Sequence, residues 1–144
     1  MKKGFHMLDE FDRASKEEYL NYLLMWNEYG QGMLYGSLAA PDQINIPMMI
    51  RNSGTILRRA PFATRKAIDH YNKCAEVCRN SGYSIFLGIT YLELGRFYKR
   101  KGKRDQAMQT LSAAARIFKE CEANASLKQA EDLLKSLDNK RGKA

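Results

Sequence analysis

The sequence predicts an all-α fold, an α-α superhelix of about two helix-turn-helix repeats with an N-terminal packing helix and a C-terminal capping helix. Three observations support this prediction. Apolar residues recur at helical spacing along most of the 144-residue chain. Glycines and prolines divide that pattern into segments of helical length. One pair of segments, residues 91–114, has a weaker copy earlier in the chain, which indicates a repeat.

The first expected helix runs from Lys16 to Leu34. Ser15 and Glu18 have the spacing of a capping box, in which each side chain bonds a backbone N–H of the first turn. Apolar residues cover more than half of the circumference, so this helix should be central or should have a second partner surface. We expect it to pack on the repeats, with a homodimer contact through the same helix as a further expectation. Residues 36–46 should form a loop.

Two further helices are expected between Pro47 and Arg79. Pro47 suits the first turn of a helix, which should end at about Arg59 because Pro61 follows. Thr64 is the expected N-cap of the second helix. Together they form a degenerate repeat, whose packed residues are Ile50, Gly54 and Leu57 on the first helix and Ala67 and Tyr71 on the second.

The clearest helix pair comes next, from about residue 84 to 101 and from 104 to 120. Residues 80–82 should end the preceding helix, with Gly82 in the left-handed conformation. Gly102 separates the two helices of the pair. Their packed faces are expected to hold Tyr91, Leu94, Gly95 and Tyr98 on the first helix and Ala107, Leu111 and Ala114 on the second.

The last expected helix starts at Ser126, which forms a capping box with Gln129, and ends near Leu137. Its single apolar face suits a helix that covers the exposed end of a repeat array. Residues 139–144 should be a basic, disordered tail. At the other end, residues 1–7 resemble the remnant of a cloning site, which leaves residues 8–138 as one helical domain.

The spacing Tyr91-x2-Leu94-Gly95-x2-Tyr98, followed by Ala107-x3-Leu111, resembles the tetratricopeptide repeat (TPR). Tyr91 replaces the tryptophan of that signature, and Leu111 replaces its second aromatic residue. The resemblance implies a superhelical scaffold that binds other proteins. It does not identify the partner.

A second likeness concerns the end of the chain. The segment from Arg116 to Cys121, RIFKEC, is followed by the AEDLL segment of residues 130–134. This arrangement resembles repeats at the C-terminal ends of large bacterial signalling proteins, including multidomain ATPase regulators and cyclases. It implies that the domain belongs to a longer signalling or regulatory protein.

The net charge of +8 is unevenly distributed. Residues 1–50 contain four basic and seven acidic residues, whereas residues 51–104 contain thirteen basic and three acidic residues. Residues 105–144 contain seven basic and six acidic residues. The positive charge therefore belongs to the repeats and not to a tail.

In TPR proteins the first helix of each repeat lines a concave groove, and the resemblance carries those positions onto this sequence one residue at a time. The expected groove residues are Arg51, Arg58 and Arg59 in the first repeat and Leu92, Arg96, Lys99 and Arg100 in the second. Guanidinium groups bind carboxylates through paired hydrogen bonds. We therefore expect a basic groove for an acidic or extended peptide segment of a partner protein. No asparagine occupies the matching positions, unlike in the TPR domains that clamp chaperone tails. The alternative is that these cations only solvate the helix surface.

Two other function classes remain open. A basic domain with aromatic residues is also typical of nucleic-acid binding, although Tyr71, Tyr91, Phe97 and Tyr98 fall at core positions and leave few rings for base stacking. Self-association within a larger signalling ATPase or regulator is the other alternative. No Ser-His-Asp arrangement, phosphate loop or metal-spaced cluster occurs, so catalysis is not expected. Asp69 and His70 are interpreted as a surface pair.

The three cysteines complete the survey of reactive groups. Cys74 and Cys78 are four residues apart on an expected helix and follow His70 at the same spacing, but small buried residues are the commoner use of such a stripe. We predict neither a metal nor a cofactor. No apolar run approaches the roughly 18 residues of a membrane span, and no secretory signal precedes the domain. The expected location is the reducing cytoplasm, without membrane contact.

Overall fold

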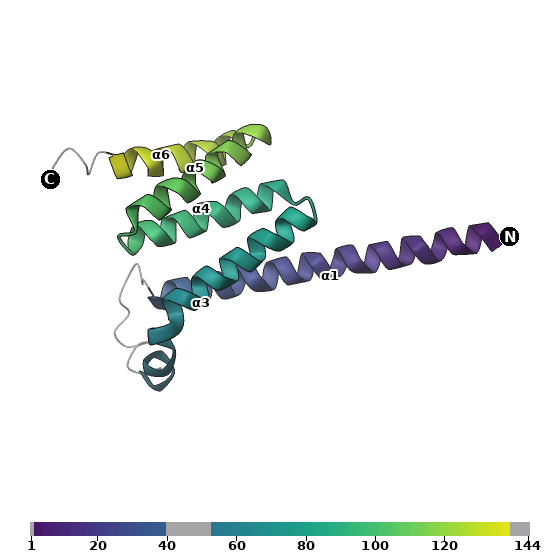
Figure 1. Cartoon of the computed structure of the whole chain (residues 1–144), viewed down its shortest axis with the longest axis horizontal. Helices are drawn as coiled ribbons and strands as arrows, with labels where there is room; N and C mark the ends of the chain where they lie inside the picture. Colours follow the sequence, from purple (N-terminus) through teal and green to yellow (C-terminus); the bar gives the residue numbers. More distant parts are fainter. Residues whose placement is uncertain (1, 40–52, 139–144) are drawn as a thin grey trace.

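The structure, a computed structural model, describes residues 2–39 and 53–138, and it describes side chains for Glu10 and for residues 13–39 and 61–138. These residues form five helices and no strand, so the predicted all-α class is confirmed (Figure 1). Among the described helices, none is both long enough and apolar enough to span a bilayer. The helices are α1 (Lys2–Ala39), α3 (Ser53–Asn80), α4 (Ser84–Arg100), α5 (Arg104–Glu120) and α6 (Asn124–Asp138).

The helices stack in chain order as two hairpins and a final helix. α1 packs chiefly on α3, α4 on α5, and α5 on α6, while α3 and α4 join the two hairpins (Figure 1). The N-terminal half of α1 extends beyond the other helices, and the side chains of residues 13–20 are all exposed.

Both hairpins use a glycine at the point where their helices meet most closely. A Cβ atom on Gly32 would lie 2.9 Å from the Tyr71 ring, and one on Gly95 would lie 2.6 Å from Cγ of Leu111. Each hairpin has a second contact, which lies seven residues before the glycine on the first helix and seven residues after its partner on the second. In α4 and α5, Gly88 meets Phe118, and in α1 and α3, Met25 clusters with Cys78. The pairing of α1 with α3 therefore matches that of α4 with α5 in register.

A continuous core runs from α1 to α6. The expected packing residues Ala67, Leu94, Ala107, Leu111 and Ala114 are all at most 3% exposed. The remaining buried side chains of this core are Tyr35 of α1, Ala63 and Tyr71 of α3, Leu92, Phe97 and Tyr98 of α4, Phe118 of α5, and Ala130 and Leu137 of α6.

Four other expected packing residues are not shown to be buried. Tyr91 is only partly buried, and its hydroxyl accepts a hydrogen bond from Arg79 at 2.9 Å. Ile50 lies outside the described residues. Gly54 and Leu57 lie on α3, where the structure describes the backbone alone.

Short turns keep the consecutive helices close together. Gly82 and Gly102 adopt φ angles of +73° and +71°, the left-handed conformation that ends a helix at little cost for glycine. The following amides close each turn, with Tyr83 N–H donating to Cys78 O and Lys103 N–H donating to Tyr98 O, both at 2.9 Å. The expected break between the two helices of the 84–120 pair is therefore confirmed.

The expected start of the first helix at Lys16 is wrong. Ser15 is exposed within α1 and caps nothing, because Ala14 and the Lys and Glu residues after it are good helix formers that carry the helix through. The expected loop is also wrong at its start, since α1 continues to Ala39. Gly36 is buried there, and a Cβ atom on it would lie 3.6 Å from Phe97 and from the Tyr71 hydroxyl, so this glycine serves helix packing and not a turn. The rest of that loop, residues 40–46, lies outside the described residues.

The division of residues 47–79 into two helices is wrong as well. α3 runs through Pro61, which removes one backbone hydrogen bond but does not end the helix. Thr64 is accordingly inside α3 and not its N-cap. Burial of Ala63, Ala67 and Tyr71 against α1 explains why the helical path is kept. At the other end of the chain, α6 begins at Asn124, so Ser126 lies inside its first turn.

Candidate functional site: a basic cleft along α4

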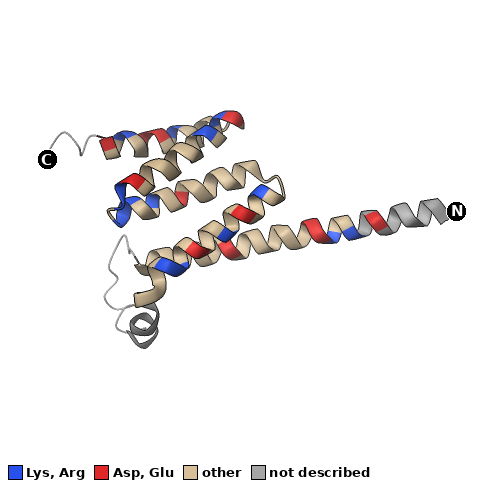
Figure 2. Ribbon diagram, viewed as in Figure 1, with Lys and Arg blue, Asp and Glu red and all other residues tan. Residues whose placement is uncertain are grey.

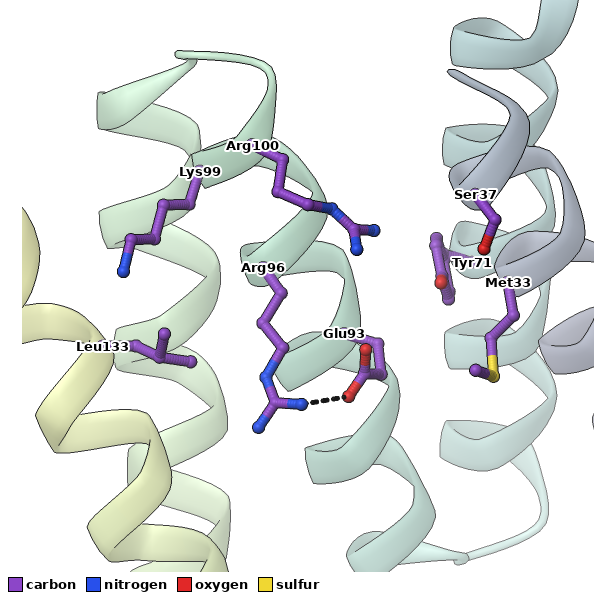
Figure 3. Close-up of a pocket in the computed structure, with 8 residues that line it drawn as sticks. All are labelled: Met33, Ser37, Tyr71, Glu93, Arg96, Lys99, Arg100 and Leu133. Atoms are coloured by element: carbon purple, nitrogen blue, oxygen red, sulfur yellow. Dashed lines mark hydrogen bonds and ion pairs between the residues drawn. The ribbon is translucent and has the colours of Figure 1, made fainter. Parts of the chain in front are cut away.

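One cleft of about 630 Å³ opens along α4. α1 and α3 form one wall and α6 forms the other (Figure 3). Glu93, Arg96 and Arg100 follow one another at i, i+3 and i+7, so a single face of α4 presents them. The lining residues are Met33, Ser37, Tyr71, Glu93, Arg96, Lys99, Arg100 and Leu133.

Arg96 is held in place from two sides. Its Nη1 donates to Glu93 Oε1 at 3.0 Å, and its Nη2 donates to Gln129 Oε1 of α6 at 2.8 Å (Figure 3 shows the first bond). These bonds occupy two of the five N–H donors of a guanidinium group. The side chain remains 38% exposed. Arg96 therefore keeps donors for a further acceptor in the cleft while its orientation is fixed.

The other two cations point to opposite walls. Lys99 reaches towards α6, where its Nζ donates to Ser136 Oγ at 2.6 Å. Arg100 extends towards the side of Tyr71 and Ser37 (Figure 3). With Glu93 as the one carboxylate among the lining residues, the lining has an excess of positive charge.

Basic residues also gather just beyond the cleft, at the turn between α4 and α5 (Figure 2). Lys101 Nζ donates to the carbonyl of Ala39 at 3.3 Å, and Lys103 lies 5.9 Å from the centre of the Tyr98 ring. Arg104 pairs with Asp138 at 3.3 Å. These cations follow directly after Lys99 and Arg100, so they add positive charge at the same end of α4.

Tyr71 of α3 lines the wall of the cleft that Arg100 faces, beside Met33 and Ser37 (Figure 3). Burial, with the Glu93 carboxylate as the second cause, raises the pKa of Tyr71 well above its ordinary value. Its hydroxyl therefore stays protonated to a higher pH than that of an ordinary tyrosine, and it can donate a hydrogen bond. Met33 and Leu133 add apolar surface on either side. The cleft thus combines cations, a hydroxyl donor and apolar walls.

The predicted groove residues are only partly brought together. Arg96, Lys99 and Arg100 line the cleft as expected from the resemblance. Leu92 does not, because it is 5% exposed and packs in the core. Arg51 lies outside the described residues, and Arg58 and Arg59 lie where side chains are not described.

Sequence reasoning missed the residues that complete the cleft. The sequence pattern predicts a loop at Ser37 and a packing role alone for Tyr71. It predicts that Gln129 is part of a helix cap. The one local signal was Glu93, whose i, i+3 spacing from Arg96 predicts the ion pair that fixes the guanidinium. Nothing local predicts that α6 folds back to supply a wall.

His70 does not form the expected surface pair with Asp69. Its Nδ1 lies 2.6 Å from Oε2 of Glu28, which is 8% exposed, and its ring stacks on Tyr35 at 5.5 Å. Asp69 instead faces Arg65 on the exposed side of α3, at 3.9 Å. The His70 contacts join α1 to α3.

Cys74 and Cys78 are each 1% exposed, as expected for core residues. The thiol of Cys74 lies 3.3 Å from the Thr90 hydroxyl. The hydrogen bond shared with Cys74, together with burial, raises the pKa of the Cys78 thiol. Among the described side chains, no three His, Cys, Asp or Glu residues lie close enough to hold a metal ion.

Comparisons with known proteins add no family to this picture. No protein-family model, no curated protein and no solved structure matches the chain. The cleft and its charges are therefore the basis for a functional proposal.

Proposed function

We propose that this chain is a non-catalytic protein-interaction module, built as a TPR-like scaffold, whose α4 cleft binds an acidic, extended peptide segment of a partner protein. The observation that carries the proposal is the convergence of Arg96, Lys99 and Arg100 on one cleft that holds a single carboxylate, Glu93. A peptide carboxylate would accept hydrogen bonds from the remaining donors of Arg96, whose orientation is already fixed by Glu93 and Gln129.

The shape and lining of the cleft favour a peptide over other anions. Its apolar parts, Met33 and Leu133, lie on opposite walls and can contact side chains between two acidic residues. The Tyr71 hydroxyl supplies a neutral donor for a backbone carbonyl. A single phosphate would leave most of the roughly 630 Å³ unfilled.

Nucleic acid is the second candidate, and burial of the aromatic residues near the cleft argues against it. Tyr71, Phe97 and Tyr98 are 1%, 0% and 8% exposed, so they offer no ring face to a base. Single-stranded nucleic acid is usually bound by stacking on such rings. Phosphate attraction alone would remain, and it would be unselective and strongly salt-dependent.

Titration of a fluorescently labelled peptide of alternating Glu and Leu tests the proposal directly. The cleft variant is Arg96→Glu/Arg100→Glu. The matched control is Arg65→Glu/Arg116→Glu, because these arginines are 89% and 76% exposed, lie outside the cleft lining and change the net charge equally. We expect the cleft variant to weaken binding by at least about tenfold, since charge-assisted hydrogen bonds contribute about 1.5–3 kcal/mol each, and the control to change it by less than about twofold.

Two further ligands make the outcome unambiguous. A peptide with Gln in place of every Glu should bind weakly to all proteins. A single-stranded oligonucleotide should bind equally weakly to both double variants. Equal losses of peptide affinity in the cleft and control variants would overturn the cleft as the site, and tighter binding of the oligonucleotide than of the acidic peptide would overturn the peptide as its ligand.

A further inference from the structure

Another cavity, of about 340 Å³, lies where α1 passes the turn between α3 and α4 (Figure 1). Four of its lining residues stand at i, i+3, i+4 and i+7 on α1, so they share one side of that helix, and the turn contributes a tyrosine. We name this cavity the tyrosine pocket; it is lined by Ser15, Glu18, Tyr19, Tyr22 and Tyr83.

Tyr83 is held against α1 at both of its ends. At the backbone end, Gly82 adopts a φ angle of +73°, and the Tyr83 amide donates to Cys78 O at 2.9 Å. At the other end, the Tyr83 hydroxyl donates to the carbonyl oxygen of Glu18 at 3.4 Å. The turn therefore fixes one aromatic wall of the pocket relative to α1.

The two tyrosines of α1 supply aromatic surface that remains accessible. The Tyr22 ring meets Trp26 edge to face, with 6.3 Å between the ring centres, and Trp26 meets Phe86 of α4 at 5.4 Å. These contacts hold Tyr22 through its neighbour on the same helix. Tyr22 and Tyr19 are still 43% and 62% exposed, so a ligand can reach both rings.

The surroundings of the tyrosine pocket are electronegative. Aromatic rings carry negative charge on their faces. The Glu18 carboxylate lies close enough to the Tyr83 phenol to raise its pKa, as the second cause after burial. Residues 9–18 contain five acidic and two basic residues, and the two basic ones, Arg13 and Lys16, do not line the pocket. The local charge therefore favours a cation.

A neutral or anionic ligand would suit this lining poorly. An apolar ligand would cover the Glu18 carboxylate without pairing it, and an anion would be repelled by it. A cation that carries methyl or methylene groups would contact the tyrosine rings through those groups and would balance the carboxylate charge. The volume is at the lower end of the roughly 300–1,000 Å³ of ligand pockets, which suits a small head group.

We propose that the tyrosine pocket binds an alkylammonium group, the chemistry that methylated lysine side chains and free methylated amines share. Three rings would surround the cation, and Glu18 would neutralise it. The pocket and the α4 cleft have no lining residue in common, so this site does not depend on the proposed peptide function.

Titration with choline at constant ionic strength tests the proposal. The fluorescence of Trp26 is the readout, because this is the one tryptophan of the chain and its ring adjoins Tyr22. We expect a saturable change with choline. The uncharged isostere of choline, in which a carbon atom replaces the ammonium nitrogen, should bind at least about fivefold more weakly, since it loses the cation–π attraction.

Replacement of Tyr19 tests the aromatic contribution. Tyr19→Ala should weaken choline binding by about two- to fivefold, the loss expected for one cation–π contact at an exposed site. Tyr19→Phe keeps the ring and should stay within about twofold of the wild-type chain. Phe62→Ala is the matched control, because Phe62 is also 62% exposed but lies on α3 outside the pocket lining, and it should leave choline binding unchanged.

Replacement of Glu18 tests the charge. Glu18→Gln should weaken choline binding by about two- to fivefold, as for a partly screened ion pair. Glu17→Gln removes the same charge one residue away, outside the lining, and should change it by less than about twofold. Both positions are exposed, so both variants should fold. Arg96→Glu/Arg100→Glu should bind choline like the wild-type chain, which separates this site from the α4 cleft.

A peptide that carries one dimethyllysine identifies the source of the ammonium group. Tighter binding of this peptide than of choline would assign the site to a lysine of a partner protein, and the reverse order would assign it to a free amine. Equal binding of choline and its uncharged isostere, or no saturable binding, would overturn recognition of a cation. Unchanged affinity in both Tyr19→Ala and Glu18→Gln would overturn the tyrosine pocket as the site.

Discussion

Gly95 of α4 lies directly against the side chain of Leu111 of α5, so close that a Cβ atom on Gly95 would stand 2.6 Å from Cγ and 2.7 Å from Cδ2 of the leucine. Leu111 is completely buried. Its side chain therefore cannot move aside without disturbing the core between the two helices. This contact sets how closely α4 and α5 approach, and α4 carries the cations of the cleft.

We predict that Gly95→Ala destabilises the protein by about 1–3 kcal/mol, because overpacking outweighs the gain in helix propensity. Gly36→Ala is the control, since a Cβ atom there would make ordinary contacts at 3.6 Å. It should be neutral or stabilise by up to about 1 kcal/mol. Urea unfolding followed by circular dichroism measures both changes, and equal stability of the two variants would contradict the close contact.

A similar contact between a glycine and a large side chain shows how much of the fold can be predicted from the sequence. The apolar face of residues 64–79 is predicted correctly, because Ala67, Tyr71 and Cys74 are spaced at helical period and are buried. Its partner is not predicted correctly. The sequence pattern predicts that the nearest preceding segment, residues 47–59, is the partner, whereas the contact of Gly32 with Tyr71 shows that α1 occupies that place. Periodicity identifies a face but does not identify the remote face that covers it.

The helix end predicted before Pro61 and the helix start predicted after Ser15 are wrong for a related reason. Pro61 weakens a helix locally, and Ser15 can cap one, but neither determines the outcome when the flanking residues favour continuation. For the cleft, α4 alone supplies Arg96, Lys99 and Arg100, so the resemblance could locate them. The walls come from α1, α3 and α6 and depend on packing between distant segments.

Replacement of Glu28 tests the contact that joins α1 to α3. Glu28→Ala should destabilise the protein by about 1–3 kcal/mol, because the partly buried His70 ring loses its hydrogen-bond partner. Glu28→Gln should destabilise it less, since an amide oxygen still accepts a hydrogen bond. In a double-mutant cycle with His70→Ala, the coupling should be about 0.5–3 kcal/mol.

Asp69→Ala is the matched control for that cycle, because its pair with Arg65 is exposed on the adjacent turn. It should change the free energy of unfolding by less than about 0.5 kcal/mol. Additive effects of Glu28→Ala and His70→Ala would show that the 2.6 Å contact does not couple the helices.

Alkaline pH should destabilise the fold through Tyr71. Burial, with a smaller contribution from Glu93, raises its pKa in the folded protein, so unfolding releases its proton above pH about 10. The stabilising effect is fully present below that pH and falls as the pH rises towards the folded pKa, by up to about 1.4 kcal/mol per pH unit for each such tyrosine. Urea midpoints measured between pH of about 8 and 11 should therefore decline less steeply for Tyr71→Phe. Tyr19→Phe, at a ring 62% exposed, should leave the slope of the wild-type chain unchanged.

Thiol chemistry should separate the three cysteines into two groups. Cys121 is partly exposed at the end of α5, whereas Cys74 and Cys78 are buried in the α1–α3–α4 core. In the native protein an aromatic disulfide reagent should modify one thiol quickly and the other two only as the core opens, slower by a factor on the order of 10³ or more. Cys121→Ser should abolish the fast phase alone. Two fast thiols in the wild-type chain would contradict the burial of the pair.

Gln129 offers a test of how the cleft is organised, given the proposed peptide function. Its Oε1 accepts a hydrogen bond from Nη2 of Arg96 at 2.8 Å, and it carries no charge of its own. If this bond orients the guanidinium, Gln129→Ala should weaken binding of the acidic peptide by roughly fivefold, the equivalent of about 1 kcal/mol for one hydrogen bond. The unfolding midpoint should barely change, because the pair is exposed. Gln109→Ala, the same replacement at an exposed site of α5, should leave peptide affinity intact. Should Arg96→Ala weaken binding strongly while Gln129→Ala does not, the cation would act by charge alone, and α6 would have no part in positioning it.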